Sequence, residues 1–384
     1  MKKLSKNTHL TKEDIIKNGS IFTPKHIVDL VFNMTKKYIN DETIIGDFCS
    51  GYGAFIDVFN KTKNRCFGTE ADSKSYEFLK GNFNNEFFFE NSLLNVTREK
   101  YNIKENNDLI IVGNPPYNDV TSQYKNGQKG SFLCDEGLKC RDMGVSFLKA
   151  YNKLSPNHIC ILHPLSYLIK KQNFKMLGDF RANYKLIDAT IFSSKEFESI
   201  KKSNAEFPVV AALYKREENG MDYEYINKFK FKILKCKKRF CLNEITTIDG
   251  KVQKYPTKEN KTKLQFYTQR DMNSLLRNTA FIDGPKNNGI NVNIDNLYQY
   301  SWLYFLKQNF NPKKNKFLYG NLSPLYIKNI EENETKNSIV SYAYNNCDIV
   351  QKYYTKAEIE QEYGTLKEDY SGLYDELNKL YLFE

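Results

Sequence analysis

The chain has 384 residues, enough for two or three domains at roughly 150 residues each. Its 57 Lys and Arg exceed its 46 Asp and Glu, and the net charge of +11 favours a polyanionic partner such as nucleic acid. No apolar stretch approaches a transmembrane span and no signal peptide is visible, so we expect a cytoplasmic protein without membrane contact. The eight Cys and four His lack metal-ligand spacing, so no metal site is predicted.

A first helix is predicted over residues 25–39, because apolar residues recur there at helical spacing. It follows Phe22, Thr23 and Pro24, and proline suits the first turn of a helix. Thr23 therefore lies near a helix N-terminus, where a hydroxyl and backbone N–H groups favour an anion. An ordinary helix cap is the alternative.

A strand over 43–48, a glycine-rich turn and a helix over 55–61 form the first strand–helix unit of a Rossmann-like fold. The turn contains Asp47, Cys49, Gly51 and Gly53, and its glycines allow a ligand to approach the backbone closely. The spacing is not G-x-G-x-x-G, which weakens the dinucleotide alternative, and a purely structural turn stays open.

Polar residues follow the next two predicted strands, which cover 65–69 and 86–89. Glu70 ends the first of them, and an acid at this position can accept hydrogen bonds from both hydroxyls of a ribose. Asn91 and Ser92 follow the second strand. Asp72 is expected to cap the helix over 73–80.

The most informative stretch is a buried strand from residue 109 that runs into Gly113, Asn114, Pro115, Pro116 and Tyr117. Two prolines cannot join a ladder, so the strand stops and leaves carbonyl oxygens able to accept hydrogen bonds. An amide oxygen, a free carbonyl and an aromatic ring suit an aromatic amine such as the exocyclic nitrogen of adenine. Two acceptors could bind both amine protons, and Tyr117 could stack on the base, which is worth about 1–3 kcal/mol.

Further strands are predicted over 158–163, 184–192 and 208–214, the last preceded by Phe207. Strands and helices alternate over about 20–215, which indicates an α/β protein with a doubly wound sheet. The irregular segment 117–143 follows the proposed site directly, so we expect a lid that orders on substrate.

The stretch Asn114-Pro115-Pro116-Tyr117 resembles the catalytic motif of the adenine-N6 DNA methyltransferases, which use S-adenosylmethionine. Phe22-Thr23-Pro24 is similar to the segment that precedes their sheet. The turn from Asp47 to Gly53 resembles their D-P-x-C-G-x-G loop, with Phe48 where proline is usual. The resemblance covers a little more than half of the chain, and its motifs stand in the expected order.

The resemblance implies a Rossmann-like methyltransferase that methylates N6 of an adenine flipped out of duplex DNA. Asn114 to Tyr117 would be catalytic, and Phe207 would pack on the flipped base. The resemblance also implies contacts with the cofactor. Phe22 and Thr23 would contact its methionine carboxylate, and Asp47 would face its ammonium group. Cys49, Gly51 and Gly53 would contact it from the loop, Glu70 would bind its ribose, and Asn91 or Ser92 would bind its adenine. An Asp is usual where Asn91 stands.

The sequence pattern changes near residues 215–220, so we divide the chain into a catalytic domain, 1–218, and a mixed α+β target-recognition domain, 219–384. Lys230 and Lys232 alternate with Phe229, Phe231 and Ile233, which predicts a strand with one basic face. These two lysines are our candidates for DNA contact, since basic faces with nearby aromatic residues suit phosphates and bases. Interleaved aromatics are Tyr255, Phe266 and Tyr267.

The last segment, from Ala357, has a heptad-like apolar stripe and is acidic, so it is a poor phosphate ligand. We expect it to pack back on the recognition domain in a monomer, and a dimer contact is the alternative.

Two other functions stay open. The first is an RNA or protein-glutamine methyltransferase with the same motif, and the second is a nucleic-acid-binding protein without activity. A DNA methyltransferase of this kind would be associated with the nucleoid, and a restriction enzyme could accompany it.

Overall fold

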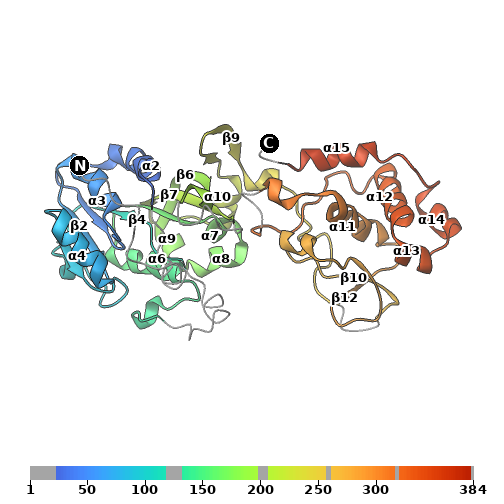
Figure 1. The fold of residues 1–384 in the computed structure, drawn as a ribbon, viewed down its shortest axis with the longest axis horizontal. Coiled ribbons are helices and arrows are strands. Elements are labelled where there is room, and N and C mark those ends of the chain that lie inside the picture. The colour runs from blue at the N-terminus through green and yellow to red at the C-terminus, as the bar shows by residue number, and fades with distance from the viewer. Residues whose placement is uncertain (1–22, 118–131, 198–205, 257–260, 316–319, 382–384) are drawn as a thin grey trace. The chain divides into compact units, whose positions relative to one another are not determined.

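The computed structural model describes residues 23–117, 132–197, 206–256, 261–315 and 320–381. The chain forms two compact units, Met1–Cys241 and Leu242–Glu384, and each contains its own sheet (Figure 1).

The first unit is built on a nine-stranded sheet with the order β3-β2-β1-β4-β5-β7-β6-β8-β9. The five strands from β3 to β5 are parallel, and β7 lies antiparallel between β5 and β6. The seven strands expected within residues 43–214 are all present, and the predicted α/β doubly wound class is confirmed. Their bounds are β1 (Ile44–Asp47), β2 (Cys66–Glu70), β3 (Glu86–Phe89), β4 (Leu109–Gly113), β5 (His158–Pro164), β6 (Tyr184–Ser193) and β7 (Pro208–Arg216).

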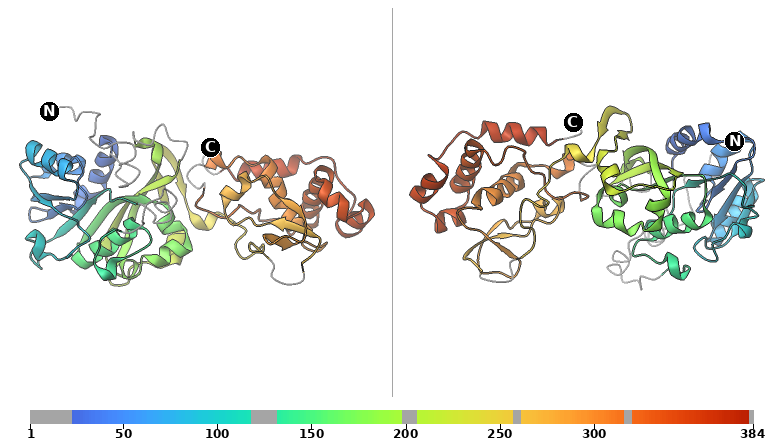
Figure 2. Two further views of the ribbon diagram at one scale, coloured as in Figure 1. Left: turned by 60° about the horizontal axis from the view of Figure 1, so that its bottom comes forward. Right: turned by 180° about the vertical axis from the view of Figure 1, so that it is seen from behind.

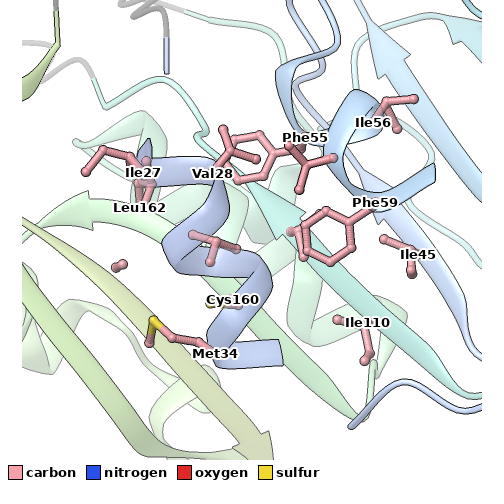
Figure 3. Close-up of a cluster of buried hydrophobic side chains, with 14 of the residues drawn as sticks. Ile27, Val28, Met34, Ile45, Phe55, Ile56, Phe59, Ile110, Cys160 and Leu162 are labelled. Carbon is pink, nitrogen blue, oxygen red and sulfur yellow. The ribbon is translucent and has the colours of Figure 1, made fainter. Parts of the chain in front are cut away.

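Helices cover both faces of this sheet (Figure 2). On one face, α2 (Lys25–Thr35) and α3 (Ala54–Phe59) bury an apolar stripe against the strands. Figure 3 shows Ile27, Val28 and Met34 of α2 in this cluster, together with residues of β1, β4 and β5. Alternate residues of a strand point to one face, which is why Ile45, Ile110 and Leu162 meet the same helices. The other helices of the unit are α4 (Ser73–Asn82), α6 (Met143–Leu154), α7 (Ser166–Ile169), α8 (Lys171–Met176), α9 (Asp179–Asn183) and α10 (Tyr223–Lys228).

The sheet does not end at β6. Strands β8 (Phe231–Ile233) and β9 (Cys236–Phe240) form a hairpin, and β8 pairs in parallel with β6 through Thr190 and Ile191. Phe231 and Ile233 are buried, and Lys232 is exposed, as the alternation predicted. The first unit therefore extends to Cys241, and the boundary that we placed after residue 218 is too early.

The second unit combines a three-stranded antiparallel sheet, ordered β11-β10-β12, with helices. This is the mixed α+β composition that the sequence predicted. Trp302 of α11 is fully buried, and its indole Nε1 donates to the carbonyl of Leu325 at 3.0 Å. The elements are β10 (Leu264–Tyr267), β11 (Phe281–Asp283), β12 (Gly289–Asn291), α11 (Leu297–Asn309), α12 (Asn333–Asn346), α13 (Asp348–Tyr353), α14 (Lys356–Tyr363) and α15 (Ser371–Lys379).

The acidic tail forms two helices, α14 and α15, and both pack back on the second unit as expected. Ile359, Leu373 and Leu377 are buried, and the Tyr374 ring lies edge to face with Phe305 at 5.3 Å. No helix in the described part of the chain is both long and apolar enough to cross a membrane.

Candidate active site

The carboxyl ends of β1, β2, β4 and β5 share one edge of the sheet because these strands are parallel. Strand β7 runs the other way, and Val209 pairs with Pro164 at the end of β5, so Phe207 lies at the same edge. Asp47, Glu70, Asn114 and Phe207, which are far apart in the sequence, are thus brought to one place. In open α/β sheets this edge is the usual ligand site.

Asn114 directly follows β4, and its side chain is anchored to the start of α2. Its amide Nδ2 donates to Thr23 Oγ1 at 3.1 Å. An amide whose nitrogen is held in this way offers its oxygen, Oδ1, as an acceptor. Thr23 precedes Pro24, the N-cap of α2, and makes no helix cap, so its hydroxyl serves Asn114 instead. Among the described residues, no backbone N–H donates to the carbonyl of Pro115.

Tyr117 and Phe207 meet at this edge with ring centroids 6.4 Å apart and an interplanar angle of 82°. Burial raises the pKa of Tyr117 above its usual range, so the phenol stays neutral at all moderate pH values. Tyr117 is seated against Gly144 in α6, where an added Cβ would lie 3.2 Å from Tyr117 Cβ and 2.5 Å from Tyr167 Oη. Asp142 caps α6 by accepting from Gly144 N, and it also accepts from the Tyr167 hydroxyl. These contacts hold the beginning of α6 against Tyr117.

Asp47 is a fully buried carboxylic acid at the end of β1. Its Oδ1 accepts from Cys49 N at 3.2 Å, whereas its buried Oδ2 has no hydrogen-bond partner in the described residues. Burial is the main cause that raises the pKa of Asp47 to about 7, and the nearby Glu70 adds to the shift. A buried acid with one unsatisfied oxygen is a group that a cationic ligand would stabilise.

Glu70 organises the glycine-rich turn. Its Oε2 accepts from Gly51 N at 2.8 Å and its Oε1 from Asp72 N at 2.8 Å. Gly51 has a φ of +52°, and a Cβ there would meet nothing within 4 Å, so a ligand can approach this backbone. Gly53 differs, because a Cβ would lie 2.7 Å from the Phe83 ring. Gly53 therefore serves helix packing as well as the turn.

The two candidates for an adenine contact, Asn91 and Ser92, are already occupied by local hydrogen bonds. Asn91 Nδ2 donates to Leu133 O at 2.9 Å, and its Oδ1 accepts from Leu93 N. Ser92 is buried, and its hydroxyl donates to Phe48 O at 2.9 Å. Both residues lie at the expected edge, but in this conformation their side chains shape the loop.

Phe48, which departs from the expected proline, is part of an aromatic cluster beneath the turn. Its ring lies edge to face with Tyr101 at 5.0 Å and with Phe67 at 5.5 Å, and it is buried. Space for it comes from Gly46, where a Cβ would lie 2.8 Å from the Phe48 ring. Cys49 lies beside this cluster, and burial raises the pKa of its thiol well above the usual value.

Sequence reasoning overlooked Phe89, whose side chain is 55% exposed at the end of β3. Its ladder partner is Glu70, so an apolar ring stands beside the predicted ribose acid. The available signal was a large aromatic residue at the last position of a strand on the ligand edge.

The remaining residues predicted from the sequence to contact cofactor or DNA belong to different parts of the chain. Phe22 lies outside the described residues, as does 118–131 of the proposed lid. Lys232 is exposed on β8, but its Nζ is 2.7 Å from Asp188 Oδ2, so an acid already pairs with this cation. Phe266 is fully buried in the second unit and cannot stack on a base, whereas Tyr255 is exposed. No group of three or more His, Cys, Asp or Glu in the described parts of the chain could hold a metal ion.

A curated protein and several solved structures are similar to part of this chain. No protein-family model matches the chain. A stretch of 110 residues is 32% identical to the Type II methyltransferase M.CvrRI of Paramecium bursaria Chlorella virus XZ-6E, and it spans 28% of this chain and 27% of that protein.

Solved methyltransferase structures are similar at low sequence identity. A SAM-dependent methyltransferase from Anabaena variabilis is 10% identical, with 54% of this chain and 92% of that chain covered at a TM-score of 0.34. The tRNA (uracil-54, C5)-methyltransferase of Pyrococcus abyssi, in complex with S-adenosyl-L-homocysteine, is 15% identical, with 49% and 37% covered at a TM-score of 0.29. The strand order and directions of β1 to β7 themselves define a Rossmann-like, doubly wound sheet in which β7 is antiparallel.

Proposed function

We propose that the protein is an S-adenosylmethionine-dependent methyltransferase that modifies N6 of adenine in duplex DNA. The observation that carries this proposal is the placement of Asn114 at the end of β4. Its amide is anchored to Thr23, and it shares one sheet edge with Tyr117, Phe207 and the buried Asp47. An acceptor, aromatic rings and an acid for a cationic cofactor are the groups that this reaction needs.

The residues at this edge fit S-adenosylmethionine. The unsatisfied Asp47 Oδ2 suits the ammonium group, and the accessible backbone at Gly51 suits the methionine portion. Glu70 would exchange its bond to Gly51 N for bonds to the ribose. When bound, the cofactor supplies an electrophilic methyl group.

The protein's own task is to make a poor nucleophile attack. Asn114 Oδ1 and the Pro115 carbonyl accept hydrogen bonds from the two N–H groups of the amine. These bonds favour a tetrahedral nitrogen with a localised lone pair. Tyr117 stacks on the base and holds the nitrogen in line, and such positioning supplies much of the rate. No general base is needed before attack, because the nitrogen becomes cationic on methylation and then releases a proton.

Two alternatives share part of this support. RNA carries the same exocyclic amine, and a glutamine side chain offers a comparable amide nitrogen. The net charge of +11 favours a nucleic acid over a peptide. The 110-residue match to a viral Type II methyltransferase supports methyl transfer, and a comparison of duplex DNA with RNA as methyl acceptor decides between the two nucleic acids. A protein that binds nucleic acid without activity would have no need for the anchored Asn114. A companion restriction enzyme stays a prediction.

The decisive test replaces Asn114 by Ala. We expect methyl transfer to DNA to fall by about 100-fold or more, the scale seen when one transition-state hydrogen bond is lost. Binding of S-adenosylmethionine, measured by calorimetry, should stay within a few-fold of wild type.

The matched control is Asn60→Ala, since Asn60 bonds to Asn85 ahead of β2 and β3, at the other end of these strands. Transfer by that variant should be normal. Full transfer by the Asn114 variant would refute the proposed chemistry, and absence of cofactor binding by the wild-type protein would refute the enzyme assignment.

A further inference from the structure

We propose that the tip of the β8–β9 hairpin, residues 234–239, binds the phosphodiester backbone of the nucleic acid substrate beside the target base. The inference rests on the proposed function only for the identity of that substrate. It moves the main phosphate contact from Lys230, just before β8, and Lys232, on β8, to the turn and the first residues of β9.

The tip lies at the same edge of the sheet as Asn114. Strand β6 ends at Ser193, which pairs with Pro208 at the beginning of β7. Strand β8 is parallel to β6, so its C-terminal end and the turn that follows reach this edge. Leu234, the first residue after β8, donates its N–H to Ile191 O at 2.9 Å and fixes the turn on the sheet.

Side-chain contacts connect the tip to the anchor of Asn114. Lys235 Nζ lies 3.1 Å from Glu196 Oε1, and His26 Nε2 lies 2.7 Å from Glu196 Oε2. His26 belongs to α2, three residues after Thr23, whose hydroxyl holds Asn114. Because α-helical residues rise about 1.5 Å each, a single turn of chain separates these two contacts.

A bulge aims further cations outward. Ile233 pairs with Cys236, and the next ladder pair joins Lys232 to Arg239, so Lys237 and Lys238 stand outside the ladder. Bulges turn side chains away from the regular pleat and are common beside active sites. Every residue from Lys235 to Arg239 is exposed.

The local charge balance favours an anion. Lys232 and Lys235 have acidic partners, Asp188 and Glu196. Lys237 and Arg239 form no ion pair with any residue in the described ranges. A strand edge rich in lysine has one structural alternative, because edge lysines also prevent pairing between the edges of two molecules. Under that alternative their removal would cause self-association and leave DNA binding unchanged.

The test is a salt titration of DNA binding by the full-length chain. The variant Lys237→Gln/Arg239→Gln should lower the slope of log affinity against log salt by about 2, since each phosphate contact contributes about 0.9. Its affinity for S-adenosylmethionine without DNA should equal that of wild type. The control, Lys61→Gln/Lys104→Gln, removes two exposed lysines that lie ahead of β2 and β4, at the other end of these strands, and should keep the wild-type slope.

A second measurement uses the unmodified protein. Cys236 is exposed within the tip, so duplex DNA should slow its alkylation by iodoacetamide several-fold, as followed by peptide mass spectrometry. An unchanged slope, or a variant that only self-associates, would overturn the inference, and so would equal alkylation with and without DNA. DNA binding that depends on the tip but occurs without methylation would refute the proposed function and leave this inference standing. Methylation of DNA by the wild-type protein, together with a wild-type salt slope in the variant, would refute this inference and leave the proposed function standing.

Discussion

At the scale of single residues, Asp47 makes the clearest electrostatic prediction. Its pKa of about 7 lies far above the usual value because the carboxyl group is fully buried. A cationic cofactor binds the ionised form, so affinity for S-adenosylmethionine should rise with pH up to about 7 and then level off. Calorimetry between pH 5 and 8 measures this dependence, and Asp47→Asn should lose both the affinity and the pH dependence.

The same group predicts how stability changes with pH in the absence of cofactor. A folded-state pKa above the unfolded value means that the folded protein binds the extra proton. The resulting stability is complete below the unfolded pKa near 3.8 and is lost as pH rises through about 7. Between pH 5 and 8 the free energy of unfolding should fall by about 2 to 3 kcal/mol more in wild type than in Asp47→Asn. Denaturant titrations of both proteins measure this difference. The same change of unfolding free energy with pH in the two proteins would contradict the raised pKa of Asp47.

Sequence predicted which residues would share the site, because strand ends in a parallel sheet meet at a known edge. Glu70 and Asn114 were placed at strand ends on that basis, whereas the role of Phe207 came only from the family resemblance. The structure brings Phe207 against Tyr117. Details that depend on distant partners could not be predicted. Asn91, for example, is occupied by the carbonyl of Leu133, which follows it by 42 residues.

At the scale of elements, the end of β4 depends on a glycine. Gly113 has a φ of +147°, and a Cβ there would lie 2.8 Å from Asp47 Oδ1. Gly113→Ala should therefore destabilise the protein, by about 1 to 3 kcal/mol for a strained backbone, and should also impair cofactor binding. Denaturant unfolding measures the first effect and calorimetry the second.

Gly81 provides a control of opposite sign for this prediction. It lies within α4, and a Cβ there would meet nothing within 4 Å. Gly81→Ala should stabilise the protein by about 0.5 to 1 kcal/mol through helix propensity. Equal effects from the two substitutions would show that the contact with Asp47 carries no strain.

The strands themselves were predictable, because buried parallel strands are short apolar runs bounded by turns. The pairing of β8 with β6 was not, since it joins Lys232 to Thr190 across an intervening strand and helix. Local charge at residues 215–220 marked a loop between β7 and α10, and nothing local showed that the sheet continues beyond it.

This pairing predicts where the chain can be cut. A fragment of residues 1–241 keeps β8 and β9 and should fold as a soluble monomer that binds S-adenosylmethionine within a few-fold of the full chain. A fragment of residues 1–218 exposes the edge of β6 and should aggregate. Size-exclusion chromatography measures the aggregation of both fragments, and calorimetry measures their cofactor binding. A monomeric, cofactor-binding fragment of residues 1–218 would favour the boundary after residue 218.

At the scale of the whole molecule, the proposed substrate, duplex DNA, combines the chemistry of the site with the charge of the chain. The first unit places an amide acceptor and aromatic rings at a ligand edge, and the chain carries a net charge of +11. The identity of the methylated nucleoside therefore tests the proposed function most directly.

The most direct measurement is the identity of the methylated nucleoside. The protein, or its Asn114→Ala variant, is produced in a bacterial host that lacks adenine methylation, and the host DNA is digested and analysed by mass spectrometry. We predict N6-methyldeoxyadenosine in DNA from cells with the wild-type protein and none from cells with the variant. Unmodified adenine in both samples, or equal methylation by the two proteins, would contradict the account.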